Sequence, residues 1–102
     1  MTSDPFPEAM LALMQQRGVS TRKLSEKTRD MFNGWGAQVT IHRLSTGEVP
    51  ATIEAIERIA RALEVDPDYF AEYRLAMFRA QFDPEQVSLR VALANLDRYE
   101  NR

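Results

Sequence analysis

The stretch Gln38–Thr46 holds the side chains of this sequence that are best suited to specific hydrogen bonding. The amide of Gln38 could pair with adenine, the guanidinium of Arg43 with guanine, and the methyl groups of Val39 could contact thymine. Two further polar side chains can each donate and accept hydrogen bonds, namely Thr40 and His42. The chemistry that this set indicates is recognition of base edges.

Two of these residues admit a second interpretation. His42, the single histidine, could read a base or act as a pH switch, or it could be an ordinary polar residue on an exposed helix face. Arg43 is assigned to DNA, and the alternative is a surface ion pair with an acidic side chain.

The residue types that most other site chemistry needs are missing or scattered. The chain has no cysteine and one histidine, which excludes disulfides, thiolate metal sites and a histidine-rich metal site. We find no nucleophile–base pair, phosphate-binding glycine loop or metal-ligand spacing. The acidic pairs Glu54/Glu57 and Asp66/Asp68 fall at helix caps and on exposed helix faces. We therefore expect no enzymatic activity, no cofactor and no metal.

Positive charge is concentrated in one part of a chain whose net charge is −2. Residues 17–46 hold six basic and two acidic side chains, a balance of +4. Residues 47–102 hold seven basic and eleven acidic side chains, a balance of −4, and the first sixteen residues add two acidic ones. Contacts to phosphate need a local positive face and not a basic whole protein, so a nucleic-acid partner is compatible with this distribution.

Hydrophobic periodicity predicts that the candidate base readers stand on a helix in an all-α fold. The helix Gln38–Thr46 should turn Ile41 and Leu44 to the core and leave the readers on its other faces. Gly47 should end it. The most regular amphipathic stretch is Ile53–Leu63, which should supply an apolar wall for this helix.

Capping residues and breakers predict the remaining helices, four short and one longer. Ser20, Thr52 and Asp66 are suitable N-caps, and Asn33–Gly34 can adopt the positive φ of a helix stop. Methionine and phenylalanine residues at helical spacing are interpreted as core, namely Met10, Met14, Met31, Phe32 and Met77. Besides Gln38–Thr46, the expected helices are Glu8–Arg17, Thr21 to Met31 or Phe32, Ile53–Leu63, Pro67 through Phe78, and a longer one from Asp83–Pro84 that includes Tyr99.

Three segments together resemble a known family, namely Leu24–Lys27, Thr40–Gly47, and Pro50 with Ile56–Phe70. Over roughly residues 8–72 the chain is similar to the Xre/Cro family of helix-turn-helix regulators, also called lambda-repressor-like domains. The resemblance implies a five-helix DNA-binding domain over residues 1–72, followed by a C-terminal helical extension over residues 73–102.

The family likeness also implies roles for individual residues. Base contacts would come from Gln38, Val39, Thr40 and Arg43, with His42 as a further candidate. The start of the preceding helix would place backbone N–H groups and cations on phosphate. The expected phosphate contacts are Thr21, Arg22, Lys23 and Thr46.

Two features depart from the family pattern. About six extra residues, Arg29–Gly34, separate the second helix from the third, so the second helix is longer or the turn is a loop. Trp35 follows this insertion and either caps the core or lies against the DNA backbone. Glu48 stands where the family often has a basic phosphate contact.

Apolar residues after Phe70 exceed what a five-helix module needs to close its own core. We expect them to form a helical homodimer contact, which would set two reading helices about one DNA turn apart. The alternative is that this tail folds back on its own domain. The expected dimer residues are Tyr73, Met77, Phe78, Leu89, Leu93 and Leu96.

The sequence as a whole therefore predicts a homodimeric, sequence-specific regulator of transcription that binds double-stranded DNA. Its N-terminus lacks a signal peptide and no apolar stretch could cross a bilayer, so we expect a cytoplasmic, nucleoid-associated protein without a membrane partner. The alternative is a helix-turn-helix module that binds a protein partner, as an antitoxin or anti-repressor adaptor, with weak or no DNA binding.

Overall fold

The computed structural model describes residues 1–82, and this part of the chain contains helices and no strands. The all-α prediction is therefore confirmed for residues 1–82. The predicted last helix, with Leu89, Leu93 and Leu96, lies outside the described residues. No helix within residues 1–82 is long and apolar enough to cross a membrane. The helices are α1 (Phe6–Arg17), α2 (Thr21–Met31), α3 (Gln38–Thr46), α4 (Ile53–Ala62), the 3-10 turn η1 (Pro67–Tyr69) and α5 (Ala71–Ala80).

Short-range signals fix several helix ends. The hydroxyl of Ser20 accepts from Lys23 N at 3.1 Å at the start of α2, and that of Thr52 accepts from Ala55 N at 3.1 Å at the start of α4. Gly47 ends α3 in the left-handed conformation, with φ of 81°. The predicted bounds of α3 are confirmed, because its stop signal lies in the adjacent residue.

The first helix starts two residues before its predicted start at Glu8, because its cap comes from a distant part of the chain. Pro5 and Pro7 have no N–H, and the helix has no side-chain cap of its own. A carboxylate oxygen of Glu72 accepts from Phe6 N instead. An acid at a helix N-terminus is favourable both as a hydrogen-bond acceptor and as a charge.

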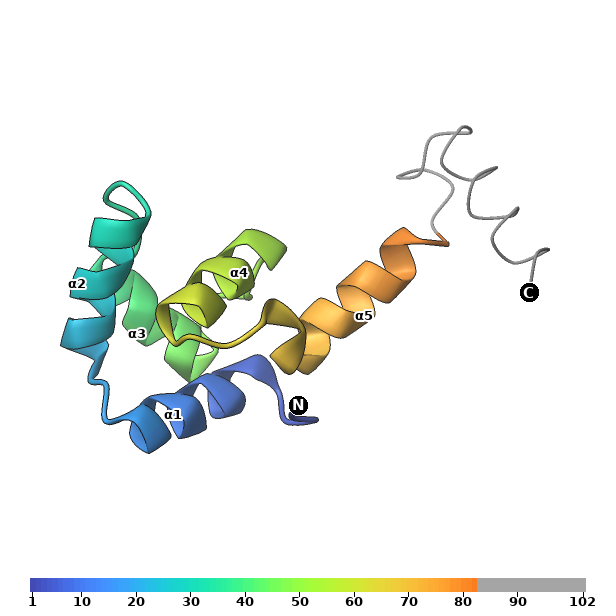
Figure 1. The fold of residues 1–102 in the computed structure, drawn as a ribbon, viewed down its shortest axis with the longest axis horizontal. Helices are drawn as coiled ribbons and strands as arrows, with labels where there is room; N and C mark the ends of the chain where they lie inside the picture. The colour runs from blue at the N-terminus through green and yellow to red at the C-terminus, as the bar shows by residue number, and fades with distance from the viewer. Residues whose placement is uncertain (83–102) are drawn as a thin grey trace.

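Helices α1 to α4 surround one apolar core, with α2 and α3 side by side and α1 across one end of them (Figure 1). Of the methionine and phenylalanine residues predicted as core, Met10 and Met14 are buried. The prediction was wrong for Met31, which lies 44% exposed at the last turn of α2, while Phe32 and Met77 are half-buried. The largest fully buried apolar side chains are Phe6, Met10, Leu24, Ile41, Ile56, Ile59, Leu63 and Phe70.

The predicted single helix from Pro67 to Phe78 is wrong, because the chain is interrupted at Phe70. The side chain of Asp66 caps η1 as expected, accepting from Asp68 N at 3.3 Å. Phe70 then adopts an extended backbone, with φ of −89° and ψ of 132°, before α5 begins. Its ring is fully buried, 4.7 Å from the ring of Phe6 between centroids. The interruption therefore goes with burial of a large aromatic ring, worth about 1.5–3 kcal/mol.

The first turns of α5 are tied to the N-terminal segment. The guanidinium of Arg74 donates to the carbonyl oxygens of Asp68 and Tyr69 at 2.8 and 2.9 Å, and to that of Thr2 at 2.7 Å. Thr2 N also donates to Tyr69 O at 3.1 Å. Helix α5 runs without a break through the predicted boundary at residue 72, and its later turns lead away from the body of α1 to α4 (Figure 1).

Candidate nucleic-acid interface

Helix α3 has one buried face and one exposed face. Ile41 is fully buried and Leu44 nearly so, as the spacing predicted, and Ser45 is buried beside them with its hydroxyl donating to His42 O at 2.7 Å. Thr40 is half-buried. The exposed candidates are Gln38, Val39, His42 and Arg43. The structure therefore brings four of the five candidate base readers to the surface of one short helix.

At the C-terminal end of α3, Arg43 and Thr46 already have partners within the protein. The guanidinium of Arg43 lies 3.7 Å from the carboxylate of Glu48, and both side chains are more than half exposed. The hydroxyl of Thr46 donates to Arg43 O at 3.1 Å and accepts from Glu48 N at 3.4 Å. The surface ion pair weighed for Arg43 is thus present, and an exposed pair of this kind is worth only about 0–1 kcal/mol. A phosphate could therefore displace Glu48 at modest cost.

The start of α2 carries the other candidate phosphate contacts. Thr21 is half-buried, whereas Arg22 and Lys23 are exposed. Arg22 forms an i,i+4 ion pair with Glu26 at 3.4 Å. Among residues 1–82, Lys23 has no carboxylate within ion-pair distance, so its ammonium group is available to a partner.

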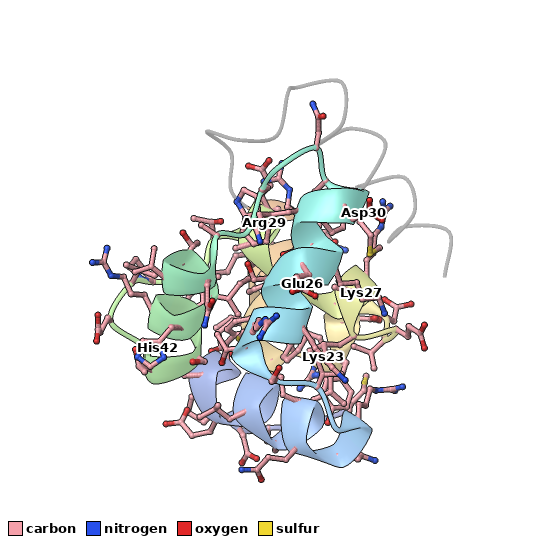
Figure 2. The ribbon with its side chains drawn as sticks, turned by 90° about the vertical axis from the view of Figure 1, so that its left-hand side faces the viewer. Lys23, Glu26, Lys27, Arg29, Asp30 and His42 are labelled. Carbon is pink, nitrogen blue, oxygen red and sulfur yellow. The ribbon has the colours of Figure 1, made fainter. Side chains whose placement is uncertain are left out.

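The outward face of α2 is charged but mixed in sign. Figure 2 shows Lys23, Glu26, Lys27, Arg29 and Asp30 along α2, with His42 to one side on α3. Lys27 is also paired, at 3.6 Å, with Glu64 beyond the end of α4. The balance of +4 over residues 17–46 already counts Glu26 and Asp30, and Glu48 and Glu64 from outside that segment reduce the positive field further.

The joint between α2 and α3 is a longer helix followed by an ordered loop, so both forms considered for the insertion occur. Helix α2 extends to Met31, and Asn33 and Gly34 follow with φ of 55° and 96°, as their types predicted. Two fully buried hydroxyls then hold the loop: Ser25 donates to Gly36 O at 2.7 Å, and Thr28 lies against Gly36 itself.

The space at Gly36 explains why no larger residue stands there. Its φ is 103°, and a Cβ atom would lie 2.1 Å from the Thr28 hydroxyl oxygen. The hydroxyl of Thr28 donates within α2, with Leu24 O at 3.0 Å and Ser25 O at 3.1 Å. The loop therefore approaches α2 closely at Gly36, two residues before α3 begins.

Trp35 packs against the core, which is the first of the two interpretations given for it. Its ring meets that of Phe32 edge to face, with 6.5 Å between centroids. The guanidinium carbon of Arg58 lies 5.0 Å from the Trp35 ring centroid and 5.9 Å from that of Phe32. Sequence reasoning missed Arg58, since its spacing within α4 gives no signal of a partner more than twenty residues earlier.

The proposed dimer residues fall into two groups within the described chain. Tyr73 is half-buried against the core, and its hydroxyl lies 3.4 Å from a carboxylate oxygen of Glu57. Its pKa is raised above 10.0, first by burial and then by the negative charge of Glu57. Met77 is half-buried, and Phe78 is 61% exposed. Tyr73 thus belongs to the contact between α5 and its own domain, whereas Phe78 points elsewhere.

Titratable groups with displaced pKa values also occur next to η1. Hydrogen bonding with the Asp68 side chain lowers the pKa of Asp66, and the same contact raises the pKa of Asp68. Within residues 1–82, no three His, Cys, Asp or Glu side chains gather as metal ligands would. The local chemistry at Asp66 and Asp68 is that of a turn cap.

Comparison of the chain with protein-family models, curated proteins and solved structures returned no match.

Proposed function

We propose that this protein is a helix-turn-helix transcriptional regulator of the lambda-repressor-like type, which binds specific double-stranded DNA as a homodimer. Helix α3 enters the major groove, and α2 lies across it with its N-terminus toward the phosphate backbone. The observation that supports this most directly is the two-faced character of α3. Its inner face is sealed by Ile41 and Leu44, and its outer face presents Gln38, Val39, His42 and Arg43.

The outer face of α3 has the composition that base readout requires. An amide and a guanidinium can each form two hydrogen bonds with one base, and the exposed Val39 can contact a thymine methyl group. Nothing in this set forms a catalytic pair, and an apolar partner would leave these polar groups unsatisfied. A hydrated, polar groove is the partner that satisfies all of them.

The phosphate contacts flank this face. Arg22 and Lys23 extend from the first turn of α2 beside backbone N–H groups, and Thr46 lies at the far end of α3. The paired acids Glu26 and Glu48 reduce the positive field, so the non-specific part of the affinity is modest. Specificity then depends mainly on the base contacts from α3.

Homodimer formation through the C-terminal extension would place two copies of α3 about one DNA turn apart. The exposed apolar side chains Leu75 and Phe78 on α5 support this part of the proposal. Met77 and the predicted residues 89, 93 and 96 would continue the same contact.

The decisive experiment selects bound sequences from random DNA duplexes and then measures affinity at several salt concentrations. Arg43→Ala should cost about 1–3 kcal/mol on the selected site and relax base preference at one position. Glu48→Gln should tighten binding, because it frees Arg43 and removes a repulsive charge. The matched control for Arg43→Ala is Arg61→Ala, which removes a positive charge from an exposed position on α4. An unchanged base preference in Arg43→Ala would contradict the assignment of α3 as the reading helix.

A second candidate is a helix-turn-helix adaptor, of antitoxin or anti-repressor type, that binds a protein. The pairing of Arg43 with Glu48 and the mixed charge on α2 favour it. Failure to retain any duplex at low salt, together with a stable heteromeric complex, would establish this function instead of the first.

A further inference from the structure

The loop between α2 and α3 is held by two separate groups of contacts. In the first group, the hydroxyls of Ser25 and Thr28 fix Gly36 against α2. In the second group, Arg58 of α4 lies over the rings of Trp35 and Phe32. The two contacts differ in kind, because the first is buried and local, whereas the second is partly exposed and joins segments more than twenty residues apart.

Arg58 is positioned for this contact by its own helix. Glu54, one turn earlier, forms an ion pair with its guanidinium group, and only 27% of the Arg58 side chain is exposed. A guanidinium within about 6 Å of an aromatic centroid is attracted to the ring face, and more strongly where water is partly excluded. Both distances meet this criterion, so one side chain engages two rings.

We propose that Arg58 is a specificity-determining positioning residue, which sets the start of α3 through its contacts with Trp35 and Phe32. This inference rests on the proposed function, since it assigns Arg58 a role in how α3 meets DNA. Trp35 precedes Gln38 by three residues, so we expect a shift of the ring to displace Gln38 and Val39 at the start of α3. From Ile41 onward α3 is fixed independently, because Ile41, Leu44 and Ser45 are buried, so only its first three residues depend on the preceding loop.

A specific pattern of base preference follows. Loss of the Arg58 contact should weaken discrimination at the bases contacted by Gln38 and Val39, and leave discrimination at the Arg43 contact unchanged. A residue that only stabilised the fold would instead lower binding at all positions alike.

The test compares Arg58→Met, which keeps the aliphatic stem and removes the guanidinium, with Arg58→Lys, which keeps the charge. Arg61→Met is the matched control, because Arg61 is exposed on the same helix and contacts no ring within residues 1–82. Each full-length variant is examined by acrylamide quenching of tryptophan fluorescence and by selection of bound duplexes. Trp35 is the single tryptophan, so the quenching signal reports its contact alone.

We expect Arg58→Met to increase quenching of Trp35 and to reduce discrimination at the Gln38 and Val39 bases about fivefold, which corresponds to about 1 kcal/mol. Arg58→Lys should recover part of both effects, and Arg61→Met should change neither. If Arg58→Met melts below the assay temperature, Arg58→Lys supplies the comparison, since it retains a cation over the rings.

Three outcomes would overturn the inference. Unchanged quenching in Arg58→Met would show that Arg58 does not hold Trp35. Increased quenching with an equal loss of binding at all base positions would show that Arg58 stabilises the fold and has no role in specificity. If the wild-type protein binds no duplex at low salt, the proposed function fails and the role in specificity fails with it. The quenching arm still measures the Arg58–Trp35 contact in that case, so the two failures are distinguished.

Discussion

Helices α3 and α5 both expose a face to solvent, but the side chains on those faces differ in kind. The outer face of α3 is mostly polar, with Gln38, His42 and Arg43 around a single exposed valine. The exposed face of α5 presents Leu75 at 48% and Phe78 at 61% exposure. A polar face stays hydrated at little cost when free, whereas an apolar face gains free energy when covered.

The two helices are also attached differently. Helix α3 is anchored from Ile41 onward by Ile41, Leu44 and Ser45. Within residues 1–82, the side-chain hydrogen bonds that hold α5 to the domain come from its first turns, from Glu72, Tyr73 and Arg74. The comparison gives α3 a polar exposed surface and α5 an apolar one, as the proposed dimeric DNA-binding function would require.

The largest expected effect is the difference in stability between substitutions on the buried face and on the exposed face of α3. Ile41→Ala should lower the free energy of unfolding by about 2–5 kcal/mol, because it leaves a cavity where a fully buried side chain stood. Val39→Ala on the exposed face should change it by no more than about 0.5 kcal/mol. Urea denaturation followed by circular dichroism measures both. Equal effects would mean that α3 does not have a buried and a free face.

A second prediction concerns the apolar face of α5. Phe78→Ser should weaken self-association by about tenfold or more, since covering a phenylalanine contributes about 1.5–3 kcal/mol. The unfolding free energy of residues 1–82 should change little, because Phe78 is mostly exposed. Analytical ultracentrifugation over a range of concentrations gives the dissociation constant, with Gln81→Ser as the exposed control on the next turn. A wild-type protein that stays monomeric would rule out the dimer.

The joint that positions α3 gives a third prediction. Gly36→Ala should destabilise the protein by about 1–3 kcal/mol, because the new Cβ would overlap the Thr28 hydroxyl and the backbone is left-handed. Gly34→Ala has a similar φ of 96° but meets no atom within 4 Å, so it isolates the backbone cost of about 1 kcal/mol. Thermal melts of both variants should therefore rank Gly36→Ala as the less stable, and the reverse order would contradict the close approach of this loop to α2.

The smallest effect concerns the attachment of α5. The pKa of Tyr73 is raised in the folded protein, so stability associated with its neutral form is complete below pH 10 and declines as pH rises through the folded pKa. Tyr73→Phe should flatten this decline, and Glu57→Gln should move the titration of Tyr73 downward by removing a nearby negative charge. Melting temperatures between pH 9 and 11 test the effect of Tyr73→Phe, and ultraviolet absorbance of tyrosinate over the same range tests the effect of Glu57→Gln. This range spans the ordinary pKa of tyrosine. If Glu57→Gln leaves the pKa of Tyr73 unchanged, the hydroxyl of Tyr73 does not lie beside Glu57 of α4.

Much of the fold within residues 1–82 could be predicted because its signals are local. Ser20, Thr52 and Gly47 act on the residues beside them, and the spacing of Ile41 and Leu44 is enough to orient α3. Predictions failed where a distant contact competes with local preference. Met31 is exposed because α2 extends past the core, and the helix expected from Pro67 breaks so that Phe70 can meet Phe6.

The candidate site divides in the same way. Periodicity alone predicts which side chains of α3 are exposed, since a helix places residues three and four apart on one face. An acidic partner for Arg43 is one of the two interpretations that the sequence allows, and Glu48 is that partner. The contact of Arg58 with Trp35, which joins α4 to the loop before α3, could not be predicted. Pairing of this kind depends on the relative placement of helices, which no local spacing encodes.

The sequence by itself therefore determined the helices, their caps and the side chains that α3 offers to a partner, because backbone hydrogen bonds and periodicity act over a few residues. Only the tertiary structure decided the start of α1 at Phe6, the interruption at Phe70 and the contact of Arg58 with Trp35. Each of these brings together residues more than twenty positions apart. Their free energy comes from burial and from hydrogen bonds that exist only once the helices have packed.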